Sequence, residues 1–345
     1  MQELTKKRHH EYVTEVAKQN GIDDATEMFS VNPTATQRII AMMRESNWFL
    51  GKVNIVSVKN QIGEAIGLGV TGMIASRTDT SGSKERTPRD MTSMTVMPYT
   101  CVQTNFDTGI RYAKLDAWAH LRNFNQIVSK HTREQIDANK ITVGFYGETA
   151  AKDTDPTKNP QGQDVNVGWI QALRKYAPER VLTEVEPDSG EVRIGEGGDI
   201  INLDLAVLNT KGLLDDACVN DPNLIAIIGS DLLAYDKAKF YEAHGNTPSE
   251  KSKIEELRVI GTYGGLPAVS VPGFPPTGLL ITSYDNLSIY IQEDSIRRSV
   301  GVKNDRKDQI ENFESMNMAY VVEQLEKAAA IDFKSVKINI NGEWV

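Results

Sequence analysis

Residues 52–100 constrain the fold of this chain more than any other segment. Within them Ile66, Leu68 and Val70 alternate with glycine and threonine, which is the two-residue period of a β-strand. Residues 76–90 then carry seven charged side chains and no large apolar one, after which the chain can return as a second strand. The sequence therefore predicts a long two-stranded ribbon with a charged tip; the alternative is a disordered surface loop.

A ribbon of this kind has no core of its own. A lone hairpin is marginal in water, and the faces of this one are glycine-rich and weakly apolar, so it must find a partner surface. The charges at its tip nearly cancel, which suits ion pairs between proteins, or simple solubility, better than nucleic-acid binding. These charged tip residues are Arg77, Asp79, Lys84, Glu85, Arg86, Arg89 and Asp90.

The first 33 residues are predicted to form an arm that is separable from the body. Residues 4–19 have the spacing of an amphipathic helix that ends at an Asn-Gly stop signal, and residues 22–33 have no period. Pro33 disfavours a helix that continues across the join. Residues 1 to about 32 are therefore expected to be removable without unfolding the body; the alternative is an ordinary N-terminal helix packed on that body.

Three further elements are expected on either side of the ribbon. A capping box opens a core helix over residues 34–51. Residues 102–112 alternate between apolar and polar side chains and form the clearest half-buried strand of the chain. Residues 115–146 then give one long helical region, which Gly144 and Gly147 end.

The second half of the chain is predicted to form a compact lobe. Residues 147–168 are polar and rich in glycine, proline and aspartate, which makes them the best linker in the sequence. Residues 165–295 read as a mixed α+β lobe in which residues 224–228 form a short buried strand. Alternating strands return through residues 316–322 and 332–340.

Length and composition exclude several classes of protein. A chain of 345 residues is expected to form two lobes, or one domain with large arms. A net charge of −9 argues against a protein that wraps nucleic acid with its whole surface. Cys101 and Cys218 form neither a disulfide framework nor a metal motif. Since no secretory signal or membrane-length apolar stretch is present, a soluble intracellular protein is expected.

The sequence carries no recognisable catalytic or cofactor motif. It lacks HExxH, GxSxG and GxxxxGK[ST], which are the patterns of zinc proteases, esterases and phosphate-binding loops. Its one glycine-rich loop, Arg193–Gly198, is explained by a turn before a helix. We therefore expect a protein that is not an enzyme and that holds no metal, nucleotide or covalent cofactor.

Eight segments, in order along residues 34–325, carry a resemblance to a known family. They are NIVSV (54–58), GEAIGLGVTGMIASRTDT (63–80), NFDTGIRYAKLDAWA (105–119), QDVNVGWIQALRKYAPERV (163–181), IGEGGDIINLD (194–204), LPAVSVPGFP (266–275), ITSYDNLSIYIQEDSIRR (281–298) and ENFESMNMAYVVE (311–323). Together they resemble the major capsid proteins of Peduovirus-like (P-two-type) tailed phages, which have the Hong Kong 97-type capsid fold.

The resemblance implies an α+β fold with named parts. The ribbon would be the extended β-hairpin called the E-loop, the long helix the spine of the peripheral P-domain, and the lobe the compact axial A-domain. The implied divisions are the N-terminal arm (1–33), the helix leading into the body (34–51), the E-loop (52–100), the P-domain (101–160), the A-domain (161–299), the returning P-domain strands (300–335) and the C-terminal tail (336–345).

The resemblance also implies a structural function. Such subunits assemble into hexamers and pentamers of an icosahedral phage head that encloses double-stranded DNA and contacts it non-specifically. The implied partners are other copies of the chain, an internal scaffolding protein, a phage maturation protease and a portal, with no membrane; the location is the virion, and the host cytoplasm during assembly. The charged tip residues would be intersubunit contacts, and the protease would cut the arm near Val31, Asn32, Pro33 and Thr34.

Two alternatives stand beside this interpretation. An encapsulin-like compartment has the same fold but packages enzyme cargo, so its gene neighbours would differ. A nucleotide-dependent α/β enzyme built on residues 190–300 belongs to another class, and flat thermal-shift titrations with nucleotides would count against it.

The missing motifs predict a purified subunit without bound metal. Elemental analysis of the purified protein should find zinc well below one equivalent per chain, because no histidine or cysteine has zinc-ligand spacing. Stoichiometric zinc would overturn this prediction.

Overall fold

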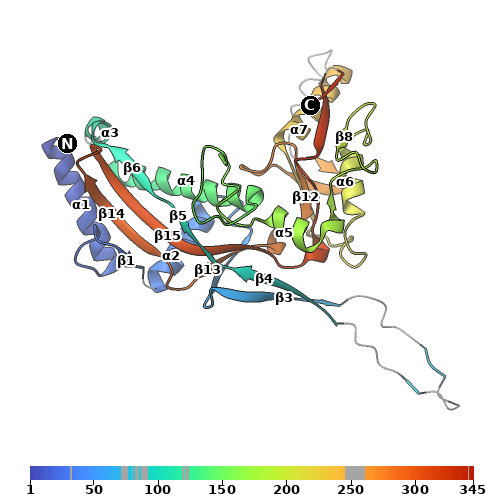
Figure 1. Ribbon diagram of the computed structural model, residues 1–345, viewed down its shortest axis with the longest axis horizontal. Coiled ribbons are helices and arrows are strands. Elements are labelled where there is room, and N and C mark those ends of the chain that lie inside the picture. The colour runs from blue at the N-terminus through green and yellow to red at the C-terminus, as the bar shows by residue number, and fades with distance from the viewer. Residues whose placement is uncertain are drawn as a thin grey trace. The chain divides into compact units, whose positions relative to one another are not determined.

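The chain folds into two compact units, each assembled from three separate stretches. The computed structural model describes residues 1–31, 33–70, 77–79, 81, 85–86, 92–118, 120, 124–244, 261–340 and 342–345. Unit 1 comprises Met1–Gly63, Tyr99–Gln171 and Leu287–Val321, and unit 2 comprises Glu64–Pro98, Ala172–Asn286 and Val322–Val345. Many of the elements of both units are labelled in Figure 1.

Unit 1 is organised by one mixed sheet whose central member is the long strand β15. In the described part of the chain this sheet has seven strands in the order β1-β14-β15-β13-β2, with β5 and β6 also paired to β15. Strand β13 runs parallel to β2, whereas β14, β5 and β6 are antiparallel to β15. The strands are β1 (Phe29–Ser30), β2 (Asn54–Val58), β5 (Val102–Asn105), β6 (Thr108–Arg111), β13 (Leu287–Gln292), β14 (Arg297–Asn304) and β15 (Gln309–Val322).

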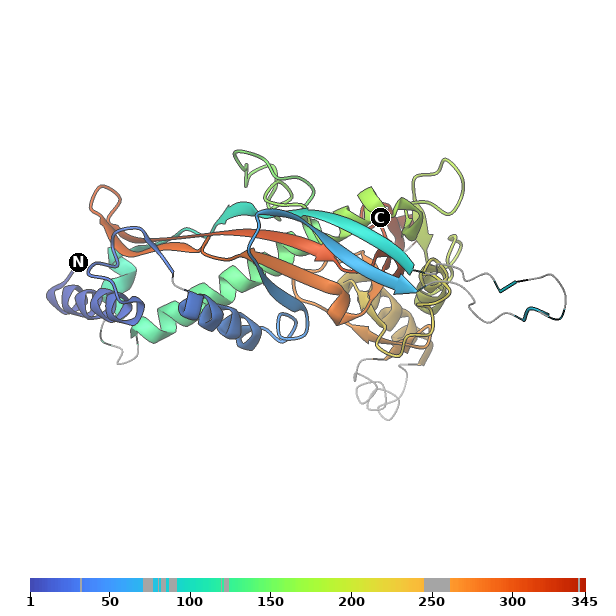
Figure 2. The ribbon, with the colours of Figure 1, turned by 90° about the horizontal axis from the view of Figure 1, so that it is seen from below.

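Helices cover one side of this sheet. Figure 2 shows α1, α2 and α4 along the same side of the strands of unit 1. The helices are α1 (Glu3–Asn20), α2 (Pro33–Ser46), α3 (Tyr112–Trp118) and α4 (Phe124–Tyr146). The structure confirms the predicted first helix and its stop, since Gly21 takes a left-handed φ of 68° as its C-cap.

The core of unit 1 is centred on Trp169. Its indole is fully buried and meets the rings of Phe49, Phe145 and Tyr320 at centroid distances of 6.3, 5.0 and 5.2 Å. The indole N–H donates to the Ser288 carbonyl at 3.0 Å, so its polar atom is satisfied inside the core. One side chain therefore joins the loop after α2, the end of α4 and two strands of the sheet.

Two predicted helix ends are wrong, and the core explains why. Gly144 does not end a helix but lies inside α4, where an added Cβ would be 2.5 Å from Trp169 Cζ3. This glycine is therefore a site of close approach. The helix predicted over residues 34–51 ends at Ser46, although Phe49 is fully buried in the following turn. The Asn47 side chain accepts from the Phe49 N–H at 2.9 Å and stabilises that turn.

Two predicted continuous elements are each divided. The strand expected over residues 102–112 is β5 and β6, which keep one register along β15 but are interrupted at Phe106 and Asp107. The helix expected over residues 115–146 is α3 and α4, with His120 in a turn between them. Strand β14 was not predicted, because the alternation of its side chains is disturbed by a register shift between Ser299 and Val302.

Unit 2 is a mixed α+β lobe, as its sequence predicts. In the described residues a six-stranded sheet has the order β10-β11-β9-β12-β16-β7, and a three-stranded sheet has the order β18-β17-β8. The strands are β7 (Val181–Leu182), β8 (Val192–Ile194), β9 (Ile225–Ile228), β10 (Thr262–Tyr263), β11 (Leu266–Val269), β12 (Leu279–Thr282), β16 (Ala329–Ile331), β17 (Val336–Ile340) and β18 (Glu343–Trp344). The helices are α5 (Trp169–Tyr176, which begins in unit 1), α6 (Leu203–Lys211) and α7 (Ser230–His244), with single turns at Pro178–Arg180, Tyr284–Asn286 and Leu325–Lys327.

Two elements of unit 2 have a local cause in the sequence. Asn202 caps α6 by accepting from the Leu205 N–H at 2.8 Å. The predicted buried strand is β9, whose four residues are all buried at the centre of the larger sheet. The sequence did not predict the ion pair of Arg174 with Asp332, which has two contacts of 2.7 and 2.6 Å.

The fit of Trp169 against Gly144 predicts a large effect of one added methyl group. Gly144→Ala should lower the free energy of unfolding by about 1–3 kcal/mol, because the indole has no room to move. The control is Gly212→Ala, at an ordinary φ of −65° and with its nearest atom 3.3 Å from the new Cβ; it should change stability by less than about 1 kcal/mol. Urea unfolding of the free subunit measures both, and equal stabilities would contradict the packing described here.

Candidate functional site: the ribbon and the arm

The root of the ribbon is a pair of hydrogen-bonded strands. The predicted flanking strands are confirmed as β3 (Ile62–Val70) and β4 (Thr92–Thr100), which pair in a two-stranded sheet. At its base the Cys101 N–H donates to the Gln61 carbonyl at 2.8 Å, and the Gln61 side chain donates back to the Cys101 carbonyl at 3.2 Å. These reciprocal hydrogen bonds close the hairpin where it leaves unit 1.

Aromatic packing holds the same base in place. The ring of Tyr99 packs edge-on against Tyr290 of β13, with centroids 4.9 Å apart. Gly63 allows this position, because an added Cβ would lie 2.6 Å from the Tyr99 hydroxyl oxygen. Cys101 is fully buried beside it, and burial raises the pKa of its thiol to about 11. A neutral buried thiol is consistent with packing, the role expected from the sequence.

The charged tip residues that the structure describes are exposed. Arg77, Asp79, Glu85 and Arg86 all lie at the surface. The Asp79 carboxylate accepts from the side chain and backbone of Ser81 at 2.6 and 3.0 Å, and these hydrogen bonds lower its pKa. Such a local turn requires no neighbouring core. Lys84, Arg89 and Asp90 lie outside the described residues.

The arm is packed on unit 1, beginning with the first turn of α1. Gln2 is the N-cap of this helix, but its side chain makes no capping hydrogen bond. Instead Asp116 of α3 accepts from the Gln2 N–H at 2.8 Å and from the Thr5 hydroxyl at 2.6 Å. These hydrogen bonds lower the pKa of Asp116. A carboxylate more than a hundred residues away therefore provides the cap that the local sequence lacks.

The middle of α1 fits a notch in strand β14. His9 donates through Nε2 to the Gly301 carbonyl at 2.9 Å, and burial lowers the pKa of its imidazole. Gly301 has a φ of 79°, and an added Cβ would be 2.5 Å from Val13 Cγ2. Its own N–H donates to the Asn312 side chain at 2.8 Å. The notch is thus formed by β14 and β15, and the helix enters it.

The tail of the arm joins the edge of the same sheet. Phe29 and Ser30 form β1, which pairs antiparallel with β14 opposite Arg298 and Arg297. The N–H of Val31, a residue only 2% exposed, donates to the Ile296 carbonyl at 2.9 Å. Of the predicted cleavage region, Val31 is therefore buried in a hydrogen-bonded strand edge. Pro33 and Thr34 begin α2, and Asn32 lies outside the described residues.

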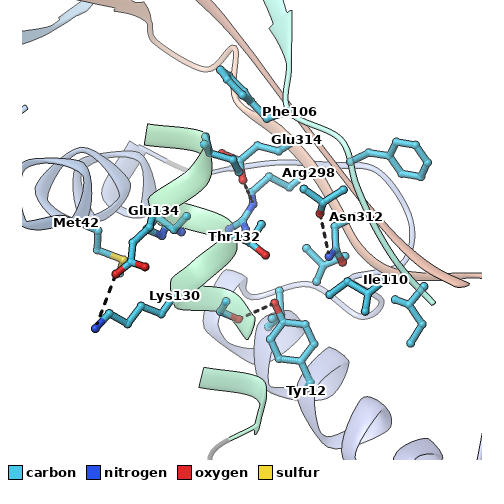
Figure 3. Close-up of a pocket in the computed structure, with 18 of the residues that line it drawn as sticks. Tyr12, Met42, Phe106, Ile110, Lys130, Thr132, Glu134, Arg298, Asn312 and Glu314 are labelled. Carbon is cyan, nitrogen blue, oxygen red and sulfur yellow. Dashed lines mark hydrogen bonds and ion pairs between the residues drawn. The ribbon is translucent and has the colours of Figure 1, made fainter. Parts of the chain in front are cut away.

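A cavity of about 530 Å³ lies within unit 1, between the arm helix, α4 and the sheet. Figure 3 shows Tyr12 on one side of it and Arg298 and Glu314 on another, with these two joined by an ion pair of 2.9 Å. Buried Lys140 also lines the cavity and pairs with Asp137 at 3.2 Å. Burial lowers the Lys140 pKa, and the charge of Asp137 opposes that shift.

Sequence reasoning missed this charged cluster. Asp137 and Lys140 stand three residues apart on α4, which in a sequence looks like an ordinary exposed pair. The Ser46 hydroxyl of α2 donates to Asp137, which ties the two helices together. Only the packing of α2 on α4 reveals that the pair is internal.

The glycine-rich loop, the sequence's one candidate for phosphate binding, has a packing role. An added Cβ at Gly198, in the glycine-rich loop, would be 2.5 Å from the Trp344 ring, so this glycine makes room for the last strand. Within the residues described, no group of three or more metal-ligating side chains is found, and no helix there is long and apolar enough to cross a membrane.

Comparisons with known proteins give one consistent result. The family model "Phage major capsid protein, P2 family" matches residues 8–333. The "Capsid proteins" of Escherichia phage P2 are 41% identical over 334 residues, covering 94% of this chain and 92% of theirs. The "Major capsid protein" of Serratia phage KSP20 is 31% identical over 339 residues, covering 96% and 97%.

Comparison with solved structures agrees. A chain of "Satellite phage P4 procapsid including size determination (Sid) protein" is similar with a TM-score of 0.75 and 36% identity, covering 98% of this chain and 99% of that one. The predicted Hong Kong 97-type capsid fold is confirmed, and these findings favour the phage capsid over the encapsulin and enzyme alternatives. Both relatives are named for a structural, non-enzymatic role, as expected for this chain.

Since the family model spans nearly the whole chain, and two named capsid relatives exceed 30% identity over more than nine-tenths of it, the chain belongs to the P2 family of phage major capsid proteins.

Proposed function

We propose that this major capsid protein forms the hexamers and pentamers of an icosahedral phage head around double-stranded DNA. The observation that carries the proposal is the similarity to a procapsid subunit over 98% of the chain, with a TM-score of 0.75. Self-association into a shell follows from family membership. The scaffolding protein, protease and portal are proposed as assembly partners, with assembly in the host cytoplasm.

The ribbon tip is proposed as a contact between subunits. Its described charged residues are exposed, and the turn at Asp79 is held by its own hydrogen bonds. One exposed ion pair stabilises a contact by only about 0–1 kcal/mol. A closed shell repeats the contact at every subunit, so the small effects add up. The same tip therefore contributes little to the folding of one subunit and much to assembly.

The arm is proposed to be removed near Val31–Thr34 during maturation. The short edge strand β1 ends just before this region, α2 begins within it at Pro33, and edge strands open more readily than central ones. Because the Val31 N–H is bonded to Ile296, a protease can bind the chain there only after β1 has left β14. Local opening of β1 is thus expected to limit the cleavage rate.

The ribbon proposal predicts a variant that folds but does not assemble. Replacing residues 78–88 by a short Gly-Ser link should leave the thermal unfolding of the free subunit nearly unchanged, since these residues include no large apolar side chain whose burial would contribute about 25 cal/mol per Å². Electron microscopy should then show capsomers or free subunits instead of closed shells.

A length-matched control distinguishes the effect of ribbon length from the effect of the charged side chains at the tip. Gly-Ser replacement of the same eleven positions keeps the ribbon length but removes four of its seven charges, Asp79, Lys84, Glu85 and Arg86, so it should also fail to close shells. Normal shells from either variant would show the tip to be an ordinary surface loop. Unfolding of the free subunit would show it to be part of a core.

The cleavage proposal predicts a shortened N-terminus in mature particles. Mass spectrometry of the capsid subunit should find chains that begin between Asn32 and Ala35, whereas procapsids formed without the protease should retain residues 1–31. Mature shells that contain only chains beginning at Met1 or Gln2 would refute cleavage.

A further inference from the structure

The arm contacts the rest of unit 1 at several places along its length, and all of them precede residue 32. The first turn of α1 is held by Asp116, its middle by the notch at Gly301, and its tail by the edge of β14. The Val300 N–H also donates to the Ala25 carbonyl at 2.7 Å. None of these contacts depends on the covalent link between the arm and α2.

We propose that the rest of unit 1 carries a complete binding site, here called the seat, for the peptide of residues 1–31, so that the arm stays bound after its link to the body is cut. The partner is a helix with a short strand tail, whose recognised groups are the first-turn N–H and hydroxyl donors, the His9 imidazole and the backbone of β1. The seat would matter for maturation only if the proposed cleavage takes place. The seat itself does not depend on that cleavage.

The seat is built from parts that hold their shape through other contacts of unit 1. Asp116 follows Leu115, which is buried against Ile310 of β15. Gly301 is held by Asn312, and β14 is paired with β15 on its other side. A seat formed in this way is already ordered before the peptide binds. Little conformational entropy is therefore lost on binding, and the affinity is higher for the same contacts.

The arm is also expected to dissociate reversibly from the seat, because its helix buries few residues. Among the residues of α1 only Thr5 and Ala17 are buried, and the helix lines a cavity of about 530 Å³ instead of packing on a continuous core. Polar contacts at the start, notch and tail therefore carry much of the attachment. Loss of one such contact should shorten the bound lifetime of the cut arm measurably, which makes each contact testable.

The test is to cut the full-length subunit at an engineered place and follow the arm. A recognition sequence for a site-specific protease is inserted at position 32, the uncut protein is checked for folding by circular dichroism, and the link is then cleaved. Size-exclusion fractions are analysed by mass spectrometry over time. We expect the 1–31 peptide to elute with the body. An arm lost completely in the first passage through the column would overturn the proposal.

Matched variants of the arm itself test the seat without altering the body. Thr5→Val keeps the side-chain shape but removes the hydroxyl that donates to Asp116, so it should speed release of the cut arm about 5–10-fold. Thr14→Val makes the same change at an exposed position of the same helix and should leave the rate unchanged. Equal release rates for the two variants would overturn the assignment of Asp116 to the seat.

A variant in the body provides a second measurement of the release rate of the cut arm. Asp116→Ala removes the acceptor of both first-turn hydrogen bonds and should speed release about 10-fold or more, whereas Asp153→Ala, at an exposed loop carboxylate, should not. Shell formation by uncut protein is scored separately by microscopy. A failed seat with normal shells would refute only this inference, and a bound arm without shells would refute only the assembly proposal.

Discussion

The packing of Trp169 is the interaction on which much of unit 1 depends. Its ring meets Phe145 at the end of α4 and Tyr320 of β15, and its N–H is bonded to the carbonyl of Ser288. Tyr320 in turn donates to the carbonyl of Lys140, 2.7 Å away on α4. The helix is therefore fixed against the sheet at two successive points. That fixed face forms one wall of the cavity beneath the arm, so the seat of the arm depends on this core.

The arm and the ribbon both need a partner surface, but they obtain it in different ways. The arm and the ribbon each bury little apolar surface within themselves. The arm finds its partner in unit 1 of the same chain, through Asp116, Gly301 and the edge of β14. The ribbon tip instead presents charged side chains to solvent and forms local turns such as that of Asp79 with Ser81. The two arrangements suit the proposed roles, in which the tip contacts a neighbouring subunit and the arm is cut from the body.

Features whose cause is local in the sequence were predicted well. The ribbon strands and the buried strand β9 both follow from the short-range period of their apolar residues. Family resemblance, spread over many segments, gave the capsid fold and function that the comparisons show. The division of residues 115–146 into two helices and the extra strand β14 were missed, because a bulge and a turn disturb the pattern there.

By itself the sequence determined the character of the segments: a polar ribbon without a core, a helical arm ended by glycine, a lobe with buried strands, and no catalytic motif. Tertiary structure decided which residues act together. Gly144 looks like a helix stop until Trp169 is packed against it, and Asp116 looks like a surface acid until it caps a helix 111 residues away. The physical reason is the same in both cases. A close approach or a charge-assisted hydrogen bond depends on the distance between two groups, and for residues so far apart along the chain only folding sets that distance.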